Sequence, residues 1–182
     1  TGTAFTLGDS GDTFTFPAGA TVVNSGTATG FGGGKINQIV QTTKADVYSQ
    51  TANSWTDITD VTVDITPTAT DSKILVLASL CTSKETGGGN GSFRLVRDST
   101  VIGAGTGGDT YNGFGMTDQG VDGNTMSSQN VQIVDSPATT SATTYKCQCN
   151  NITTSHSTYI NRRAGGTTYG GFSSITVMEI LA

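Results

Sequence analysis

The clearest pattern along the chain is an alternation of apolar and polar residues with a period of two. From residue 61 to residue 65 every second side chain is apolar, and Thr62 and Asp64 fall between them. Such alternation predicts a β-strand with one buried and one solvated face. Residues 73–80 are instead almost continuously apolar, which predicts a central strand buried on both faces.

Further β-rich runs, separated by turn residues, extend this pattern over the rest of the chain. They cover residues 36–48, 55–65, 92–96, 101–102, 131–134, 143–149, 157–161 and 173–181. Residues 97–100 predict the turn of a hairpin, and the long connection at 103–130 leaves room for another strand around 112–116. No segment repeats apolar residues at the 3.6-residue period of a helix. We therefore predict an all-β fold, an antiparallel β-sandwich that is jelly-roll-like.

The first 34 residues differ from the remainder. Two short β-runs at 13–16 and 21–23 flank Pro17-Ala18-Gly19, which is a turn signal. A two-stranded element of this size cannot bury enough apolar surface by itself, so it needs a neighbouring domain or further copies of the chain. The glycine-rich stretch 30–34 is typical of a linker. We expect residues 1–34 to form a short N-terminal β-stem and linker, and residues 35–182 to form the sandwich head.

Composition and charge narrow the classes of function. The 182 residues include 25 Gly, 34 Thr and 17 Ser, only 13% are charged, and the net charge is −5. A nucleic-acid partner is not expected, because proteins that bind nucleic acids usually carry the opposite charge. No membrane insertion is expected either, because the longest apolar run, residues 74–78, is far shorter than the ~20 residues that span a bilayer. No signal peptide is visible, and a chain that begins at Thr1 is expected to be a fragment or a processed product.

The chain has three cysteines, an odd number that argues against a complete disulfide framework. Cys147 and Cys149 lie two residues apart in a predicted strand, so both point to the same face. We expect both to enter the core as small apolar side chains. A bridge from Cys81 to one of them stays open as an alternative. A metal site is disfavoured, because the chain has no second cysteine pair and a single histidine.

The residues that carry most enzyme chemistry are scarce. The chain has 12 Asp and only two Glu, and most Asp lie beside Gly, Ser or Thr, as turn residues do. His156 lies in a polar run with no nucleophile-elbow pattern nearby, and we expect it to be an exposed loop residue. Asp109, Asp118 and Asp122 of the long loop could offer oxygen ligands to Ca²⁺. We expect no enzyme and predict no cofactor or metal.

Loop aromatics offer the best candidates for a binding surface. Exposed aromatic rings present flat apolar faces on which sugar rings stack, and Asp, Asn and Arg side chains hydrogen-bond to sugar hydroxyls. We predict that the contact surface consists of side chains near glycines or near the arginine pair: Tyr111, Asn112, Phe114, Tyr159, Arg162, Arg163 and Tyr169. The alternative is that each ring packs into the sandwich or into a subunit contact. Trp55 is expected in the core or in a subunit contact.

Several stretches resemble a known group of proteins. Residues 65–76 (ITPTATDSKILV) are similar to the ITP-x-x-x-x-SKILV stretch of tail-fibre and other virion proteins of marine and cyanobacterial phages. Residues 93–100 (FRLVRDST), 135–145 (DSPATTSATTY) and 175–180 (ITVMEI) fit the same pattern in the same order. The resemblance covers residues 38–182, and residues 11–21 are similar to stretches that precede such domains in fibre proteins. Cys147 and Cys149 are not part of the pattern.

The resemblance implies a distal fibre domain, generally homotrimeric, with a β-sandwich head on a thin β-rich stem. Its role would be to attach the virion non-covalently to a glycan or an outer-membrane protein of the host, with other virion tail proteins upstream. The motifs mark strands and turns, so no binding residue is carried over from the family. A purely structural virion fibre or decoration protein is the first alternative. A polysaccharide depolymerase is the second, and the scarcity of Glu counts against it.

Overall fold

The computed structural model describes residues 15, 17–21, 36–85, 87, 90–107, 110–117 and 123–181. The chain divides into two units, Thr1–Gly32 and Gly33–Ala182. In the first unit, the amide of Ala20 donates to the carbonyl of Pro17 at 3.1 Å, which closes the turn predicted there. The rest of the predicted stem, and its boundary after residue 34, lie outside the described residues and stay a prediction.

The described part of the second unit consists of β-strands and connecting loops, and no helix in it could span a membrane. The strands are β1 (Ile36–Lys44), β2 (Tyr48–Gln50), β3 (Thr56–Ile65), β4 (Lys73–Lys84), β5 (Gly91–Arg97), β6 (Thr100–Gly103), β7 (Gly115–Met116), β8 (Ser127–Asp135), β9 (Thr143–Asn151), β10 (Thr158–Ile160), β11 (Arg162–Arg163), β12 (Gly166–Gly170) and β13 (Ser173–Ile180).

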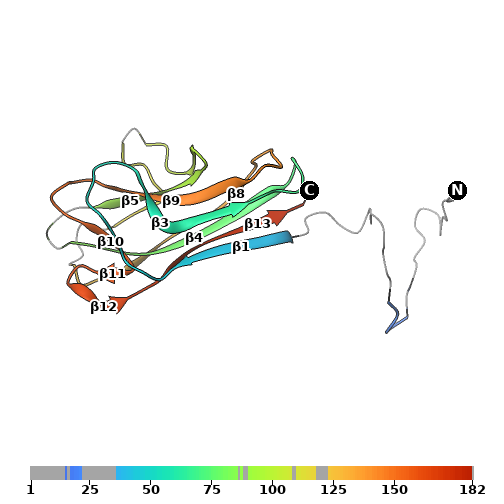
Figure 1. The fold of residues 1–182 in the computed structure, drawn as a ribbon, viewed down its shortest axis with the longest axis horizontal. Helices are drawn as coiled ribbons and strands as arrows, with labels where there is room; N and C mark the ends of the chain where they lie inside the picture. The colour runs from blue at the N-terminus through green and yellow to red at the C-terminus, as the bar shows by residue number, and fades with distance from the viewer. Residues whose placement is uncertain are drawn as a thin grey trace. The chain divides into compact units, whose positions relative to one another are not determined.

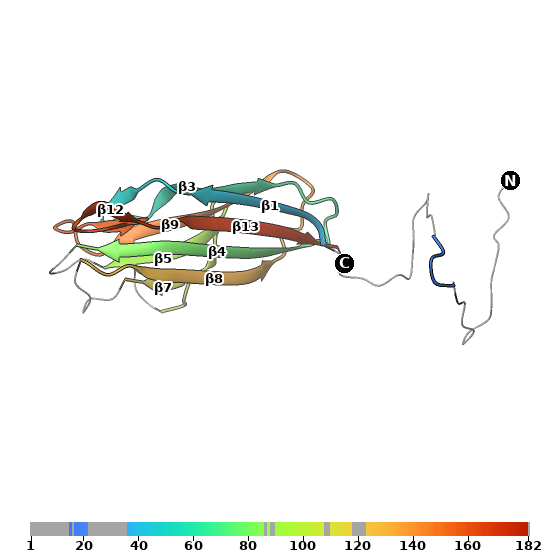
Figure 2. The same cartoon turned by 90° about the horizontal axis from the view of Figure 1, so that it is seen from below.

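The long strands form two antiparallel sheets (Figures 1 and 2). The first sheet has the order β1-β13-β4-β8, and the short strands β10 and β2 continue it beside the end of β4. The second sheet has the order β3-β9-β5-β6, with β7 beside β5. Eight strands are thus shared between two four-stranded sheets, as in a jelly roll. The predicted all-β, antiparallel, sandwich-like fold is confirmed.

The core lies between the two sheets and follows the predicted period of two. On β3, Ile58, Val61, Val63 and Ile65 are buried, and the residues between them face solvent. The remaining buried apolar residues of the core cluster are Ile74, Val76, Ala78, Leu80, Phe93, Leu95, Tyr145, Cys147, Cys149, Ile160, Ile175 and Val177. Burying side chains of this kind contributes on the order of 1.5–3 kcal/mol for each large aliphatic or aromatic residue.

The cysteines behave as the pattern predicted. Cys147 and Cys149 are fully buried in the core, and all three cysteines are free thiols. Burial raises the pKa of Cys147 to about 12 and also raises the pKa values of Cys149 and of the half-buried Cys81. The thiolate is the reactive form, so the native protein should be almost inert to thiol reagents.

The number of thiols that react can be counted with an aromatic disulfide reagent at pH 8. We expect at most one thiol, Cys81, to react slowly in the native protein, and three thiols to react at once in denaturant. Rapid reaction of two or three thiols in the native protein would contradict the buried placement of Cys147 and Cys149.

The strand boundaries depart from the sequence prediction in several places. The run at 36–48 is split into β1 and β2, and β4 continues past residue 80 to Lys84. The turn at 97–100 is confirmed, and a short strand, β7, is present within 112–116 as predicted. The β11–β12 hairpin was not predicted.

The structure decides between the two placements expected for Trp55 in part and corrects the expectation for His156. Trp55 is half-buried outside the core, because Ile58 of β3 points inward and Trp55 points to the opposite face, and the expected subunit contact stays a prediction. Its ring lies under the guanidinium of Arg94 at 4.3 Å. His156 is half-buried rather than exposed, because the side-chain amide of Asn151 donates to its carbonyl and draws the loop inward.

The buried carboxylate of Glu179 forms hydrogen bonds that join two of the stretches that carry the resemblance, residues 65–76 and residues 175–180. Its two oxygens accept hydrogen bonds from the amide and hydroxyl of Thr68 (2.6 and 2.8 Å), the hydroxyl of Ser72 (2.8 Å), and the side-chain amides of Asn37 (2.9 Å) and Gln38 (2.7 Å). The side chain is fully buried. Burial alone would raise its pKa, but these donors outweigh burial and lower the pKa to about 2.

A second polar cluster ties the two sheets together. The Nη1 atom of Arg97 on β5 lies 2.8 and 2.7 Å from the two carboxylate oxygens of Asp135 on β8. The hydroxyl of the buried Tyr145 donates to the same carboxylate at 2.8 Å. Asp98 completes the cluster, because its carboxylate accepts from the amide of Thr144 at 2.9 Å. Both clusters stabilise the fold and contain none of the predicted contact residues.

Candidate binding surface

The strands place all of the predicted contact residues at one end of the head. We call it the loop end: it comprises residues 50–55, 85, 87, 90–91, 110–117 and 151–170. It lies where β3 and β5 begin and β9 ends, since Thr56 pairs with Cys149 and Gly91 with Asn151. The opposite, C-terminal end holds the start of β1 and the end of β13 (Figure 1). The hairpin of β11 and β12 lies at the loop end, away from the C-terminus.

The first group of predicted residues belongs to the loop at 110–117 and mainly holds that loop in place. The hydroxyl of Tyr111 and the side-chain amide of Asn53 exchange hydrogen bonds of 3.0 and 3.2 Å. The side-chain amide of Asn112 donates to the carbonyl of Gly107. Both Tyr111 and Asn112 are half-buried. Their exposed parts can contribute to a contact surface, but the Tyr111 hydroxyl and the Asn112 amide already form hydrogen bonds within the protein.

Phe114 is drawn into the sandwich. Its amide donates to the carbonyl of Phe93 at 2.7 Å, and its ring packs against the hydrophobic core. The preceding Gly113 permits this approach, because a Cβ atom there would lie 2.1 Å from the carbonyl oxygen of Phe93. The alternative interpretation, that the ring packs into the sandwich, therefore describes Phe114.

The second group forms a cluster that we call the Arg–Tyr hairpin. The guanidinium of Arg162 lies 4.4 Å from the ring centre of Tyr159, and that of Arg163 lies 4.3 Å from the ring centre of Tyr169. Such cation–π contacts contribute about 0.5–1 kcal/mol each at exposed sites. Tyr169 is 59% exposed and the neighbouring Phe172 is 67% exposed. The structure thus brings four of the seven predicted residues together.

Backbone hydrogen bonds orient the two arginines. Arg162 donates to the carbonyls of Arg163 (3.0 Å) and Ala164 (3.1 Å), and Arg163 donates to the side-chain oxygen of Asn124. Among the residues that the structure describes, neither arginine forms an ion pair with a carboxylate. In a chain of net charge −5, the hairpin is therefore a local site of positive charge.

The shape of the Arg–Tyr hairpin favours surface contact over an enclosed pocket. Its depression, lined by Arg163, Gly165, Gly166, Thr168 and Tyr169, has a volume of about 50 Å³. Pockets that enclose small molecules are usually about 300–1,000 Å³. The hairpin can therefore offer stacking faces and N–H donors to a large external surface, but it cannot enclose a small substrate.

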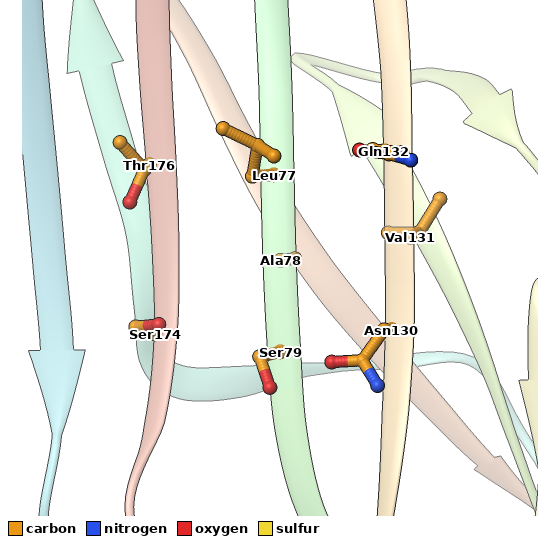
Figure 3. A pocket seen from close by; sticks show the side chains of 8 residues that line it. All are labelled: Leu77, Ala78, Ser79, Asn130, Val131, Gln132, Ser174 and Thr176. Carbon is orange, nitrogen blue, oxygen red and sulfur yellow. The ribbon is translucent and has the colours of Figure 1, made fainter.

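A larger groove lies on the outside of the first sheet. It has a volume of about 390 Å³ and runs over β13, β4 and β8 (Figure 3). Hydroxyl and amide side chains stand along it beside Leu77; Ala78 and Val131 also line it, although their side chains pack into the core. No charged residue lines it. The sequence analysis did not predict this groove, because the pairing that aligns its three strands is not visible in the sequence.

The described residues contain no group of three or more His, Cys, Asp or Glu side chains that could hold a metal ion. Asp109, Asp118 and Asp122, which could have offered ligands to Ca²⁺, lie outside the described residues.

Comparison with known proteins assigns the chain to no family. No protein-family model and no curated protein sequence matches the chain. The likeness to phage fibre domains therefore rests on the four sequence stretches, which form strands, turns and the two polar clusters of the fold.

Proposed function

We propose that the chain is the distal domain of a phage tail fibre, located on the outside of the virion, which attaches non-covalently to the host cell surface. The observation that supports this proposal is that the candidate contact residues and the start of β1 lie at opposite ends of the head. The Arg–Tyr hairpin stands at the loop end, whereas β1, the first strand of the head, begins at the opposite, C-terminal end. A fibre head needs this arrangement, with its shaft at one end and its contact surface at the other.

The proposed contact is stacking combined with charge-assisted hydrogen bonding. The exposed faces of Tyr169 and Phe172 suit the apolar faces of sugar rings or the side chains of an outer-membrane protein. Arg162 and Arg163 supply planar N–H donors that match hydroxyl, carboxylate or phosphate oxygens. Such a small surface binds weakly. We propose that three copies in a homotrimer, held by upstream tail proteins, raise the avidity through effective concentration.

A purely structural virion protein is the second candidate, and the groove without charged residues on the outer face of the first sheet favours it. We rank it second because a decoration protein has no need for cations and rings gathered at its free end. A depolymerase is less favoured still. Both glutamates already serve the fold: Glu179 accepts five hydrogen bonds, and Glu85 accepts one from the amide of Ser157 at 3.0 Å.

Binding of the fluorescently labelled chain to susceptible and resistant cells separates these candidates. Attachment predicts saturable binding to susceptible cells and none to resistant ones. A structural role predicts binding to neither. Release of reducing sugar from host envelope would instead indicate a depolymerase.

A further inference from the structure

The outer face of the first sheet carries little charge: among its described strand residues, the one exposed charged side chain is Lys73, at the C-terminal margin. Pairing in register aligns Ile39 of β1, Met178 of β13, Leu75 of β4 and Val134 of β8 in one row across all four strands. The two neighbouring rows toward the loop end consist of hydroxyl and amide side chains around Leu77. We call these three rows the neutral face.

The apolar row of the neutral face is open to solvent at its margins. Ile39 is 58% exposed and Val134 is 57% exposed, and Leu75 and Met178 between them are half-buried. Monomeric soluble proteins seldom leave a contiguous apolar band of this kind uncovered. Ile36, half exposed at the start of β1, extends the band toward the C-terminal end.

The outside of the second sheet shows what a solvated face of this fold looks like. There Asp57 accepts from Lys146 at 2.8 Å and from Gln148 at 2.6 Å, and Gln148 accepts from Arg94 at 2.8 Å. Asp57, Lys146 and Arg94 are thus connected, in part through the amide of Gln148, in a ladder of hydrogen bonds across β3, β9 and β5. The two outer faces of the sandwich therefore differ in their charged side chains, and the charged face of the second sheet is the one typical of a solvated surface.

Charge also restricts what can cover the neutral face. Copies of a chain with net charge −5 repel one another, and a face without charge is where that repulsion opposes contact least. The face measures roughly 20 by 20 Å, from four strands about 4.8 Å apart and three rows about 6.8 Å apart. Its flat area of about 400 Å² is half of the ~800 Å² that one subunit contributes to a standard interface, and the relief of its side chains adds to it.

We propose that the neutral face is the contact between copies of this chain, with Val134 at the β8 edge of one copy packed against Ile39 at the β1 edge of the next. Three such faces around one axis direct Leu75 and Met178 toward the axis, and the groove beside Leu77 receives side chains of the neighbour. Ile36, where β1 begins, lies beside the same face. The number of copies rests on the proposed fibre function; the choice of face does not.

The test compares the native mass of the chain with that of Val134→Asp and Val101→Asp by analytical ultracentrifugation. Val101 is a matched control, because it is 42% exposed on β6 of the second sheet. We expect about 56 kDa, three times 18.6 kDa, for the wild type and for Val101→Asp. For Val134→Asp we expect association at least 100-fold weaker, with monomer predominant. A monomeric wild type, or an unchanged mass for Val134→Asp, would overturn the proposal.

Cross-linking tests the edge-to-edge arrangement itself. The double variant Ile39→Cys/Val134→Cys, once oxidised, should run as covalently linked trimers on a denaturing gel, whereas Ile39→Cys/Val101→Cys should stay monomeric. Linked dimers alone would overturn the three-copy arrangement, and absence of links would overturn the edge contact. Cell binding of the same samples tests function separately: a monomer that binds cells contradicts only the interface, and an oligomer that binds none contradicts only the attachment.

Discussion

Glu179→Ala is expected to lower the free energy of unfolding by about 3–5 kcal/mol, the largest effect that we expect of any single substitution outside the core. The substitution leaves five donors around an empty site, and three of them, the amide and hydroxyl of Thr68 and the hydroxyl of Ser72, come from the connection between β3 and β4. Ser72 itself is buried, so water cannot easily replace the carboxylate. Denaturant unfolding at pH 7 and fixed protein concentration measures the loss.

The same residue predicts how stability depends on pH. The folded pKa of Glu179 is about 2, below the ordinary value of 4.5, so its stabilising effect is complete above pH 4.5 and is lost as the pH falls toward 2. At about 1.4 kcal/mol for each pH unit between these values, the ionised carboxylate contributes roughly 3 kcal/mol at neutral pH. Glu179→Gln should therefore unfold with a flatter pH dependence between pH 5 and pH 2.

Glu85→Gln is the control for both measurements, because Glu85 is the other glutamate and lies at the loop end, where among the described residues its carboxylate accepts one hydrogen bond, from the amide of Ser157 at 3.0 Å. We expect it to cost less than about 1 kcal/mol. Two results would show that the hydrogen bonds to Glu179 do not stabilise the fold. One is an equal loss of unfolding free energy for the Glu179 and Glu85 variants. The other is an unchanged pH dependence of that free energy between pH 5 and pH 2 for Glu179→Gln.

Asp135→Ala is expected to lower the free energy of unfolding by about 2–4 kcal/mol. It removes the carboxylate that joins Arg97 of the second sheet to β8 of the first, and it leaves the buried hydroxyl of Tyr145 without its acceptor. Tyr145→Phe should cost about 1 kcal/mol, because it removes the hydroxyl alone. In the double variant the losses should fall short of their sum by about 1 kcal/mol, since both substitutions break the same hydrogen bond.

Asp64→Ala provides the comparison for Asp135. Its carboxylate also accepts a hydrogen bond at 2.6 Å, from the hydroxyl of Thr144, but it lies on the exposed side of β3. We expect a loss within about 0.5 kcal/mol. Equal losses for Asp64→Ala and Asp135→Ala, or full additivity with Tyr145→Phe, would contradict the structural role of the buried cluster.

Much of the fold could be predicted because its signals are local. The period of two over 61–65 and the spacing of Cys147 and Cys149 both report which face of a strand meets the core, and burial follows them. The β11–β12 hairpin gave no such signal. It lies outside both sheets, so its residues need not alternate, and two stacked Arg–Tyr pairs support it instead of a buried apolar face.

The candidate surface was predicted in part for a related reason. The types of residue in the loops predicted that aromatic and arginine side chains form the contact surface. Which of these side chains contact one another depends on strand pairing, which the sequence does not show. Tyr159 meets Arg162 because β10 turns the ring outward while Thr158 and Ile160 point inward. Phe114 could not be separated from the exposed rings by sequence, because its burial depends on the close approach that Gly113 allows. The neutral face was missed because it exists only once four strands are in register.

The stretches that resemble phage fibre proteins have a physical meaning of their own. Ser72 and Glu179 come from two of them and are joined by a hydrogen bond of 2.8 Å, and Arg97, Asp135 and Tyr145 come from the others. These residues stabilise the C-terminal end of the head. They indicate how the domain folds, and its function must be tested at the other end.

The most direct test of the proposed attachment compares variants of the two ends on the same susceptible cells. We expect Arg163→Ala/Tyr169→Ala to raise the apparent dissociation constant at least ~10-fold, as for a central contact. Lys73→Gln, which removes one exposed positive charge at the C-terminal end, should change it less than ~2-fold. Unchanged binding of the hairpin variant, or an equal loss for Lys73→Gln, would contradict attachment through the Arg–Tyr hairpin.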